Sequence, residues 1–158
     1  MCGIAGILLN NSNKKLIKKF QKISGQLLHR GPDSSSFYKN SKNLFLHTRL
    51  SIIDLKGGKQ PIINNDLILV ANGEIYNDPE IRSTYKKYNF KTESDSESIM
   101  TLYHQEGVVG LEKLRGMYAF AIYDKRKDCT ILGRDIFGIK PLYFSLIDDG
   151  IIFSSEIT

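Results

Sequence analysis

A chain of 158 residues is long enough for one folded domain with its own hydrophobic core. The composition is 41% hydrophobic and 25% charged with 4 prolines, which excludes a disordered or fibrous protein. No apolar run approaches the roughly 18 residues of a membrane span, and no charged segment precedes the apolar stretch at the amino terminus. We therefore expect a cytoplasmic protein that does not bind a membrane.

The net charge of +5 raises the question of nucleic-acid binding, and the densest cluster of lysines lies in residues 14–22. Leu16, Phe20, Ile23 and Leu27 recur at helical spacing, which places the lysines on the solvent side of an amphipathic helix. No zinc-ligand spacing or aromatic-rich basic segment accompanies them. We therefore expect no nucleic-acid partner.

The predicted elements begin with an apolar strand at residues 3–9 and the amphipathic helix at 14–29, which ends at the turn RGPD (30–33). Two further helices and a series of strands follow. The helices are expected at 79–87 and 96–106, and the strands around Phe37 and at 44–49, 67–71, 118–123, 130–134, 142–146 and 151–154. Strands on both sides of a helical pair are typical of an α+β fold.

Cys2 follows the initiator methionine directly and precedes the first strand. Removal of Met1 would leave a thiol and a free α-amine on one residue, which combines a nucleophile with a base. A protein that retains Met1 has no free amine on Cys2 and is expected to be inactive. The alternative is that Cys2 is an ordinary buried cysteine. Cys129 lies in a short apolar strand and is interpreted as structural, because two cysteines do not suggest a disulfide scaffold.

Several polar residues could together hold a small zwitterionic amide. Arg49 closes the segment LFLHTR, and a guanidinium group suits a carboxylate. Asn72 and Gly73 follow the apolar run LILVA and could form an oxyanion hole, while Glu74 and Asp95 could hold an ammonium group. Each position has an alternative, because an arginine often makes a surface ion pair, NG a tight turn and an aspartate a helix cap.

A series of motifs runs in order along the chain. They are MCGIAGI, HRGPD, HTRLSIID, GKQPI, NGEIYN, ESDSE, LRGMYAFAIYD, GRDIFGIKPLYF and SSE. These motifs resemble the class II glutamine amidotransferase domains, and most closely the glutaminase domain of glutamine-dependent asparagine synthetases. The resemblance covers residues 1–158 as one domain. It implies an N-terminal-nucleophile hydrolase fold of the α+β class, a four-layer αββα sandwich of two antiparallel sheets.

The resemblance also implies roles for residues of this chain. Cys2 is the expected nucleophile, and the Asn72 side chain with the Gly73 N–H is the expected oxyanion hole. Glutamine is expected to bind through its carboxylate at Arg49 and through its ammonium at Asp95. The other residues expected to bind glutamine are Leu50, Ser51, Ile52 and Ile53, through their backbone, and Glu74. The residues interpreted as supports of the pocket and the domain face are Arg30, Asp33, Asp135, Lys140 and Pro141.

The implied reaction is hydrolysis of L-glutamine to glutamate and ammonia through a Cys2 thioester, without a metal or organic cofactor. In asparagine synthetases a larger ATP-using domain follows, and no SGG(I/L)DS pyrophosphate loop appears in this chain. We expect ATP and Mg only in that C-terminal or separate synthetase domain, which would dock near Phe137, Ile139 and Leu142. The sequence leaves the oligomeric state open, with a homodimer as one alternative. Aspartate is the first candidate for the ammonia acceptor, and other acids stay open.

Two alternative functions belong to other classes. An amidase of the same fold could act on a peptide or an acylated small molecule, but such substrates lack one or both charges that Arg49 and Asp95 would bind. A non-catalytic glutamine-sensing module would be expected to lose Cys2 or the Asn72-Gly73 pair, and both are present.

Overall fold

The computed structural model describes residues 1–50 and 58–157. The strands are β1 Gly3–Leu9, β2 Ser34–Lys39, β3 Asn43–Arg49, β4 Ile62–Asn64, β5 Leu67–Ile75, β6 Gly116–Asp124, β7 Cys129–Arg134, β8 Tyr143–Ile147 and β9 Gly150–Ser154. The α-helices are α1 Lys14–Ile23, α2 Asp78–Thr84 and α3 Glu97–Glu106, and the 3₁₀ helices are η1 Ser24–Leu27 and η2 Gly107–Lys113.

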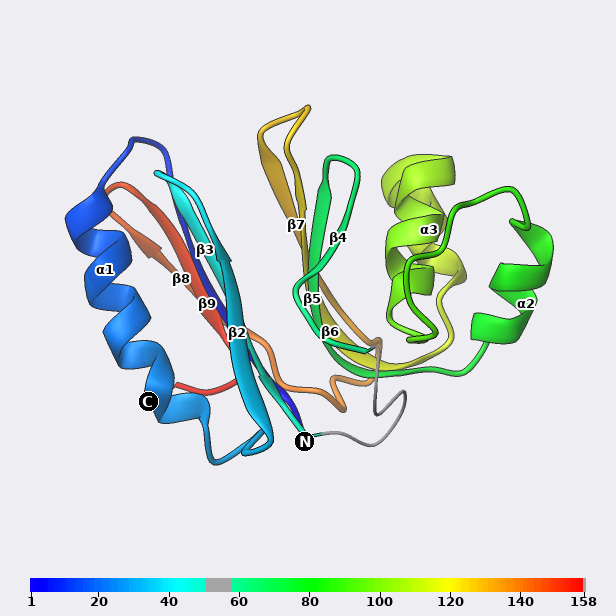
Figure 1. Cartoon of the computed structure of the whole chain (residues 1–158), viewed down its shortest axis with the longest axis horizontal. Coiled ribbons are helices and arrows are strands. Elements are labelled where there is room, and N and C mark those ends of the chain that lie inside the picture. The colour runs from blue at the N-terminus through cyan, green and yellow to red at the C-terminus, as the bar shows by residue number, and fades with distance from the viewer. Residues whose placement is uncertain (51–57, 158) are drawn as a thin grey trace.

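The described strands form two antiparallel sheets that pack face to face, with helices on both outer sides (Figure 1). The first sheet has the strand order β2-β3-β1-β9-β8, and the second has the order β4-β5-β6-β7. Helix α1 covers the outer face of the first sheet, and α2 and α3 cover that of the second. The expected four-layer αββα sandwich of the α+β class is confirmed.

Three hydrophobic clusters fill the spaces between the four layers. Ile17 of α1 packs on the first sheet, and Ile99 of α3 packs on the second. The middle cluster joins the two sheets and includes Phe45 and Phe153 of the first sheet and Val70 of the second. Each of these side chains is at most 4% exposed. Because burial of apolar area is the main favourable term in folding, the three clusters fix the layers against one another.

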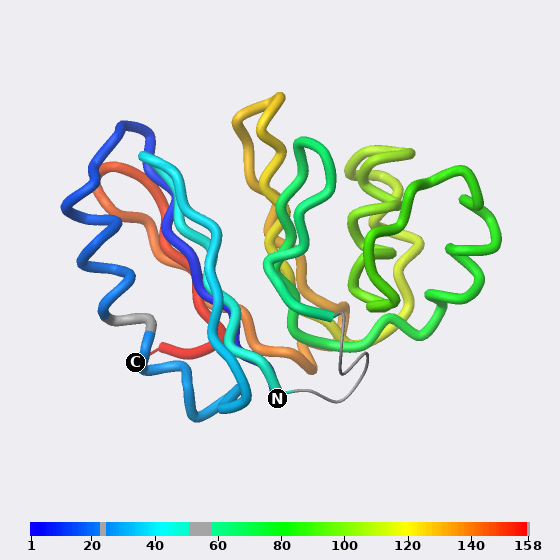
Figure 2. The backbone as a smooth tube through the Cα atoms, viewed as in Figure 1, coloured from blue at the N-terminus to red at the C-terminus, as the bar shows by residue number. Residues whose placement is uncertain are grey.

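The alternation of side chains along β3 and β5 determines what faces the space between the sheets. On β3, Phe45 belongs to the middle cluster, whereas Leu44 and Leu46 pack under α1. Since strand side chains point alternately to opposite faces, His47 and Arg49 share the side of Phe45. By the same rule, the side chain of Asn72 on β5 points between the sheets. The amino terminus lies at the lower end of this space (Figure 2).

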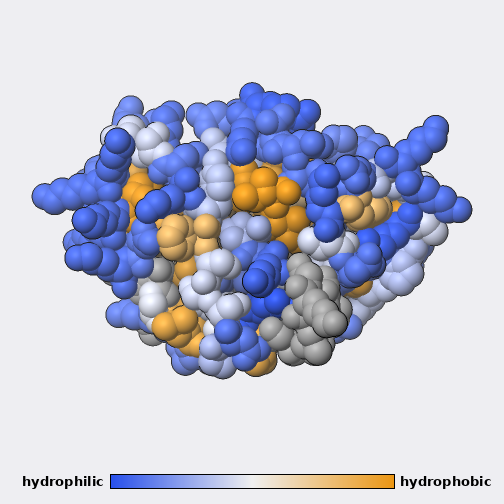
Figure 3. Space-filling view, in the orientation of Figure 1, coloured by the Kyte–Doolittle hydropathy of each residue, from blue (hydrophilic) through white to orange (hydrophobic). Residues whose placement is uncertain are grey.

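The structure differs from the sequence prediction at α1. The predicted helix at 14–29 ends at Ile23, and the chain continues as η1 to Leu27. Gly25 lies at this change, and glycine is a poor residue for a helix interior. The lysines of α1 are exposed as expected, and most of the surface on this side of the molecule is hydrophilic in the view of Figure 3. Within residues 1–50 and 58–157, no helix has the length and apolar character needed to cross a membrane.

The second difference lies at β5. This strand was predicted at 67–71 but continues to Ile75, because β6 pairs with it as far as Gly116. Asn72 and Gly73 therefore lie inside the ladder, where they pair with Ala119 and Tyr118, and the alternative of a tight NG turn is wrong. The short strand β4 and the helix η2 were not predicted. The other elements agree with the prediction to within a few residues at their ends.

Candidate active site

A cavity of about 130 Å³ opens beside the amino terminus, between the ends of the two sheets. Every predicted site residue within the described ranges lines it. These residues are Cys2, Arg49, Leu50, Asn72, Gly73, Glu74 and Asp95. The predicted residues Ser51, Ile52 and Ile53 lie outside the described residues. The fold therefore brings together side chains that are up to 93 positions apart in the chain, from Cys2 to Asp95.

Cys2 is half-buried at the start of β1, the middle strand of the first sheet. The backbone N–H of Leu50 points at its sulfur, with 3.4 Å between N and Sγ, and the Leu50 carbonyl oxygen lies 3.5 Å from Sγ. Arg30 donates from Nε to the carbonyl oxygen of Cys2 at 3.2 Å and from Nη1 to Glu156 at 2.8 Å. Arg30 of the RGPD turn thus holds the backbone of Cys2 in place.

Met1 lines the same cavity and is 55% exposed. Lys140, interpreted from the sequence as a support, is buried, and its Nζ lies 3.5 Å from the Met1 sulfur. The carboxylate of Asp135 accepts backbone N–H bonds from Ile139 and Lys140 at 2.9 and 3.0 Å. Asp135 therefore holds the backbone of the loop that brings Lys140 to the amino terminus.

Asn72 presents a buried donor to the cavity. Its side chain is 3% exposed, and its Nδ2 has no hydrogen-bond partner in the part of the chain that the structure describes. A buried donor without a partner costs roughly 1–3 kcal/mol, so such groups are usually matched by a ligand or a water. The arrangement suits a negatively charged or carbonyl oxygen in the cavity.

Gly73 brings bare backbone to the cavity next to this donor. Its φ is 154°, and a Cβ added to it would lie 2.1 Å from the carbonyl oxygen of Met117 on the neighbouring strand. No other residue type fits this position without a shift of the backbone. The residue is exposed, so a ligand can reach the main chain at Gly73.

Arg49 and Asp95 place opposite charges on the cavity wall. Arg49 ends β3 and is 6% exposed, so it is not a surface ion-pair residue. Asp95 accepts the backbone N–H of Ile75 at 2.6 Å, and the N-cap of α3 is Ser96 rather than Asp95. Desolvation by partial burial is the largest cause that raises the pKa of Asp95. A positive group on the first sheet and a negative group beside the second suit a zwitterion.

The sequence analysis missed His47, which also lines the cavity. His47 is 1% exposed, and within the described residues neither ring nitrogen has a hydrogen-bond partner of good geometry. Burial, and then the positive charge of Arg49, lower the pKa of His47 to about 4, while the backbone of Ala71 opposes this shift. The ring is neutral at neutral pH. The motif HTR indicates this position of His47, because residues two apart on a strand lie on the same face, and His47 therefore shares the face of Arg49.

Protonation of His47 should couple the stability of the fold to pH. The unfolded chain binds this proton near pH 6.5 and the folded chain only near pH 4, so stability should fall as the pH drops through this window. We expect a loss of roughly 3 kcal/mol by pH 4. Urea unfolding of His47→Gln should show a much flatter pH dependence over this range. His104→Gln, a change at an exposed histidine, is the control and should behave like the parent. An unchanged pH dependence in His47→Gln would contradict the assignment.

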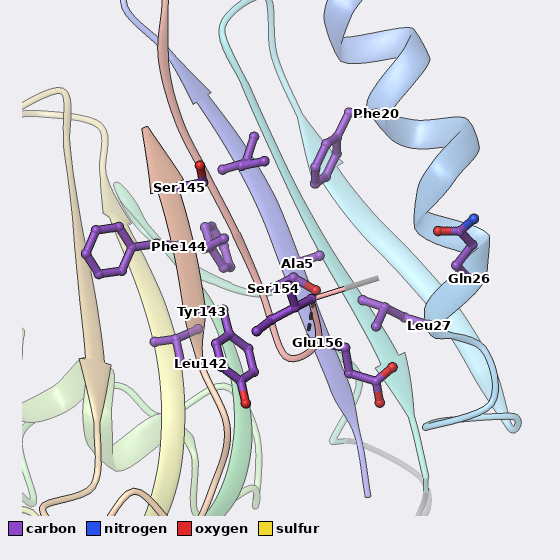
Figure 4. A pocket seen from close by; sticks show the side chains of 13 residues that line it. Ala5, Phe20, Gln26, Leu27, Leu142, Tyr143, Phe144, Ser145, Ser154 and Glu156 are labelled. Carbon is purple, nitrogen blue, oxygen red and sulfur yellow. Dashed lines mark hydrogen bonds between the residues drawn. The ribbon is translucent and has the colours of Figure 1, made fainter. Parts of the chain in front are cut away.

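A second, larger cavity of about 630 Å³ lies away from these groups, between α1 and the outer face of the first sheet near β8 (Figure 4). Its walls are mainly apolar and include Phe20, Leu27, Tyr143 and Ile152. It shares no lining residue with the Cys2 cavity. In the described ranges, no group of three or more His, Cys, Asp and Glu side chains is placed to hold a metal ion.

Comparison with known proteins identifies the family of this chain. The family model described as "Glutamine amidotransferase domain" matches residues 1–158. The chain belongs to this family. The resemblance of its motifs to class II amidotransferases is thereby confirmed, and with it the N-terminal-nucleophile class of the fold.

Curated relatives of this amidotransferase domain are much longer proteins. Glutamine-hydrolyzing asparagine synthetase B of Escherichia coli (strain K12) is 41% identical over 97% of this chain and 28% of its own length. The glutamine-hydrolyzing asparagine synthetase 2 of Bacillus subtilis (strain 168) is 40% identical over 99% of this chain and 22% of its own length. A probable glutamine-hydrolyzing asparagine synthetase of Dictyostelium discoideum is 41% identical over 99% of this chain and 29% of its own length. The chain thus spans less than a third of these relatives.

Proposed function

We propose that this amidotransferase domain hydrolyses L-glutamine to glutamate and ammonia through a thioester on Cys2, and that the ammonia serves an ATP-dependent amidation of the asparagine-synthetase type. One observation carries the proposal. The sulfur of Cys2, the unpartnered Nδ2 of Asn72 and the opposite charges of Arg49 and Asp95 line one cavity. Nucleophile, oxyanion donor and zwitterion contacts are the groups that this reaction needs.

The chemical steps follow from these groups. After removal of Met1, the free amine of Cys2 takes the thiol proton, and the sulfur attacks the side-chain amide carbon of glutamine. The resulting oxyanion accepts hydrogen bonds from Asn72 Nδ2 and the Gly73 N–H. The Cys2 ammonium then protonates the amide nitrogen, the C–N bond breaks, and ammonia leaves. Water, deprotonated by the same amine, hydrolyses the thioester to glutamate and restores the thiol.

Recognition of glutamine rests on its two charged groups. The guanidinium of Arg49 binds the α-carboxylate through two parallel N–H bonds. Asp95 binds the α-ammonium, with Glu74 as a second negative group on the cavity wall. Oδ2 of Asp95 accepts the Ile75 N–H, and the carboxylate also accepts the backbone N–H of Ser96. A carboxylate can accept about four hydrogen bonds, so Asp95 keeps acceptor capacity for the substrate. Peptides lack one or both of these charges, which favours free glutamine over a peptide substrate.

Arg49→Lys tests the recognition of the carboxylate. Lysine keeps the charge but lacks the two parallel N–H donors of a guanidinium group. We therefore expect KM for glutamine to rise by about tenfold to a hundredfold, with a smaller change in kcat. Steady-state ammonia release at several glutamine concentrations measures both constants. Arg126→Lys, at a side chain that is 55% exposed, is the matched control and should leave KM unchanged. Parent-like KM in Arg49→Lys would place the carboxylate elsewhere.

Covalent labelling tests the proposed function directly. Protein shown by intact mass to lack Met1 is incubated with the γ-glutamyl analogue 6-diazo-5-oxo-L-norleucine. We expect one adduct per chain, on Cys2, and protection by excess glutamine. An adduct on Cys129, or no adduct in the absence of Met1, would refute the mechanism. Ammonia and glutamate should appear in equal amounts during turnover of unlabelled protein, without dependence on ATP.

The ammonia acceptor and the docking of a synthetase portion extend this proposal. Aspartate is the acceptor that the names of the relatives favour. Exposed apolar residues support a docking face on the loop before β8, because Phe137 is 86% exposed and Ile136 is 91% exposed. Ile139, at 54% exposed, belongs to the same loop, whereas Leu142 packs partly against the middle cluster and is not freely available. Exposed apolar surface of this kind is typical of a contact with another domain.

A further inference from the structure

The segment of residues 85–96 joins α2 to α3 and carries Asp95 to the cavity wall. Glu97, in the first turn of α3, is 0% exposed and bonds backbone N–H groups of this segment. Its carboxylate accepts the N–H of Lys91 at 2.9 Å, the N–H of Thr92 at 2.7 Å and the Thr92 hydroxyl at 2.8 Å. A buried carboxylate with several donors is a strong, directional anchor.

Arg82 of α2 holds the same segment from its carbonyl side. Its Nη2 donates to the carbonyl oxygen of Ser94 at 2.8 Å, and its Nη1 donates to that of Thr92 at 3.2 Å. Its Nε donates to Asp78 at 2.9 Å, and its guanidinium lies over the ring of Phe90 at 4.3 Å. The planar group is therefore fixed on both of its edges and on one face.

The two side chains bond neighbouring parts of one short loop. Glu97 takes the N–H groups of residues 91 and 92, and Arg82 takes the carbonyl groups of residues 92 and 94. The next residue is Asp95, whose Oδ2 accepts the Ile75 N–H of β5. Neither Glu97 nor Arg82 lines the cavity. Their bonds leave Asp95 little freedom to move away from β5.

We propose that Glu97 and Arg82 are positioning residues that hold Asp95 in place for the ammonium group of the substrate, and thereby set the selectivity of the site for amides that carry an α-amine. This inference rests on the proposed glutaminase function. According to this inference, Glu97 and Arg82 affect the recognition of one substrate group, the α-amine. A general loss of stability would affect all substrates alike. The hydrogen bonds of Glu97 and Arg82 described above do not involve Cys2 or Asn72, so the carboxamide chemistry at these two residues is not part of the effect.

Glu97→Gln is the sharpest change available. Glutamine keeps the size of the side chain but replaces one acceptor oxygen with an NH₂ group, which faces the N–H donors of Lys91 and Thr92. One backbone bond of the loop is then lost in a buried place. Arg82→Lys keeps the charge but cannot bond Asp78 and two carbonyl oxygens at once. It provides a second, milder variant should Glu97→Gln not fold.

The experiment compares kcat/KM for L-glutamine with that for 4-carbamoylbutanoate, which is glutamine without its α-amine. In Glu97→Gln we expect the value for glutamine to fall by about tenfold to a hundredfold and the value for the amine-free compound to change little. Arg82→Lys should show the same pattern with a smaller loss. Glu106→Gln is the matched control, because this residue lies on the same helix but bonds Lys113 and Tyr85, and it should keep the parental ratio.

A double-mutant cycle separates positioning from a structural role. Asp95→Asn removes the charge that Glu97 and Arg82 position, so adding Glu97→Gln to it should produce almost no further loss of selectivity. Equal losses for both substrates in Glu97→Gln and in Arg82→Lys, or full additivity with Asp95→Asn, would overturn the inference. A parent protein that releases no ammonia from glutamine would instead overturn the proposed function, and this inference with it.

Discussion

Cys2→Ala should abolish the release of ammonia from glutamine while glutamine still binds. In the proposed mechanism the thiol is the nucleophile, and none of the contacts assigned to the two charges of the substrate involves it. Removal of a catalytic nucleophile typically lowers kcat by at least about 10⁴-fold. Ammonia release and equilibrium binding of glutamine measure the two effects.

The second cysteine of the chain is the matched control for this change. Cys129 begins β7, outside the Cys2 cavity, and Cys129→Ala should retain most of the activity. Protein in which Met1 is retained should behave like Cys2→Ala, because its Cys2 nitrogen is an amide and cannot take a proton. Turnover by protein proven by mass to carry Met1 would be incompatible with the α-amine as the base.

Asn72→Ala is expected to give the next largest loss. Its Nδ2 is buried and unpartnered in the described structure, so the donor is available to the oxyanion without competition. Loss of one oxyanion donor lowers kcat by about 10²-fold to 10³-fold, whereas KM for glutamine should change little. The fold should tolerate the change, since no described hydrogen bond of Nδ2 is lost.

Circular dichroism and thermal melting check the fold of this variant beside its kinetics. Asn11→Ala is a control of the same chemistry on the surface, where the asparagine bonds Asp149, and it should leave kcat unchanged. A kcat near that of the parent in Asn72→Ala would mean that the oxyanion is held by other groups. A rise in KM without a fall in kcat would assign Asn72 to ground-state binding instead.

Much of the fold could be predicted from local pattern. The strand at the amino terminus, the solvent face of α1 and the helix before Glu106 all follow from the spacing of apolar residues. The continuation of β5 through Asn72 and Gly73 could not be predicted in this way. It depends on β6, where Gly116 stands opposite Ile75, and local propensity contains no information on a strand that lies more than 40 residues later.

The candidate site, too, could be predicted only in part from local sequence pattern. Arg49, Asn72 and Asp95 had ordinary local interpretations, and only the resemblance of the motifs to a family grouped them with Cys2. Glu97 was hidden because an acidic residue in the first turn of a helix is ordinary, and its bonds to Lys91 and Thr92 depend on how the loop folds back. His47 was hidden because its burial depends on the packing of one sheet on the other.

The place of β1 has a consequence for when the site can form during synthesis of the chain. The strand that begins beside Cys2 pairs on one side with β9, and Ile4 exchanges hydrogen bonds with Ser155 at 2.8 and 3.0 Å. Arg30, which holds the Cys2 carbonyl, is itself bonded to Glu156. The strand beside Cys2 therefore gains its second pairing neighbour only when a segment more than 140 residues later has been synthesised. Until then, β1 is paired in its sheet with β3 alone, and Arg30, which bonds the Cys2 carbonyl, lacks its bond to Glu156, so the end of the sheet beside Cys2 is completed late in folding.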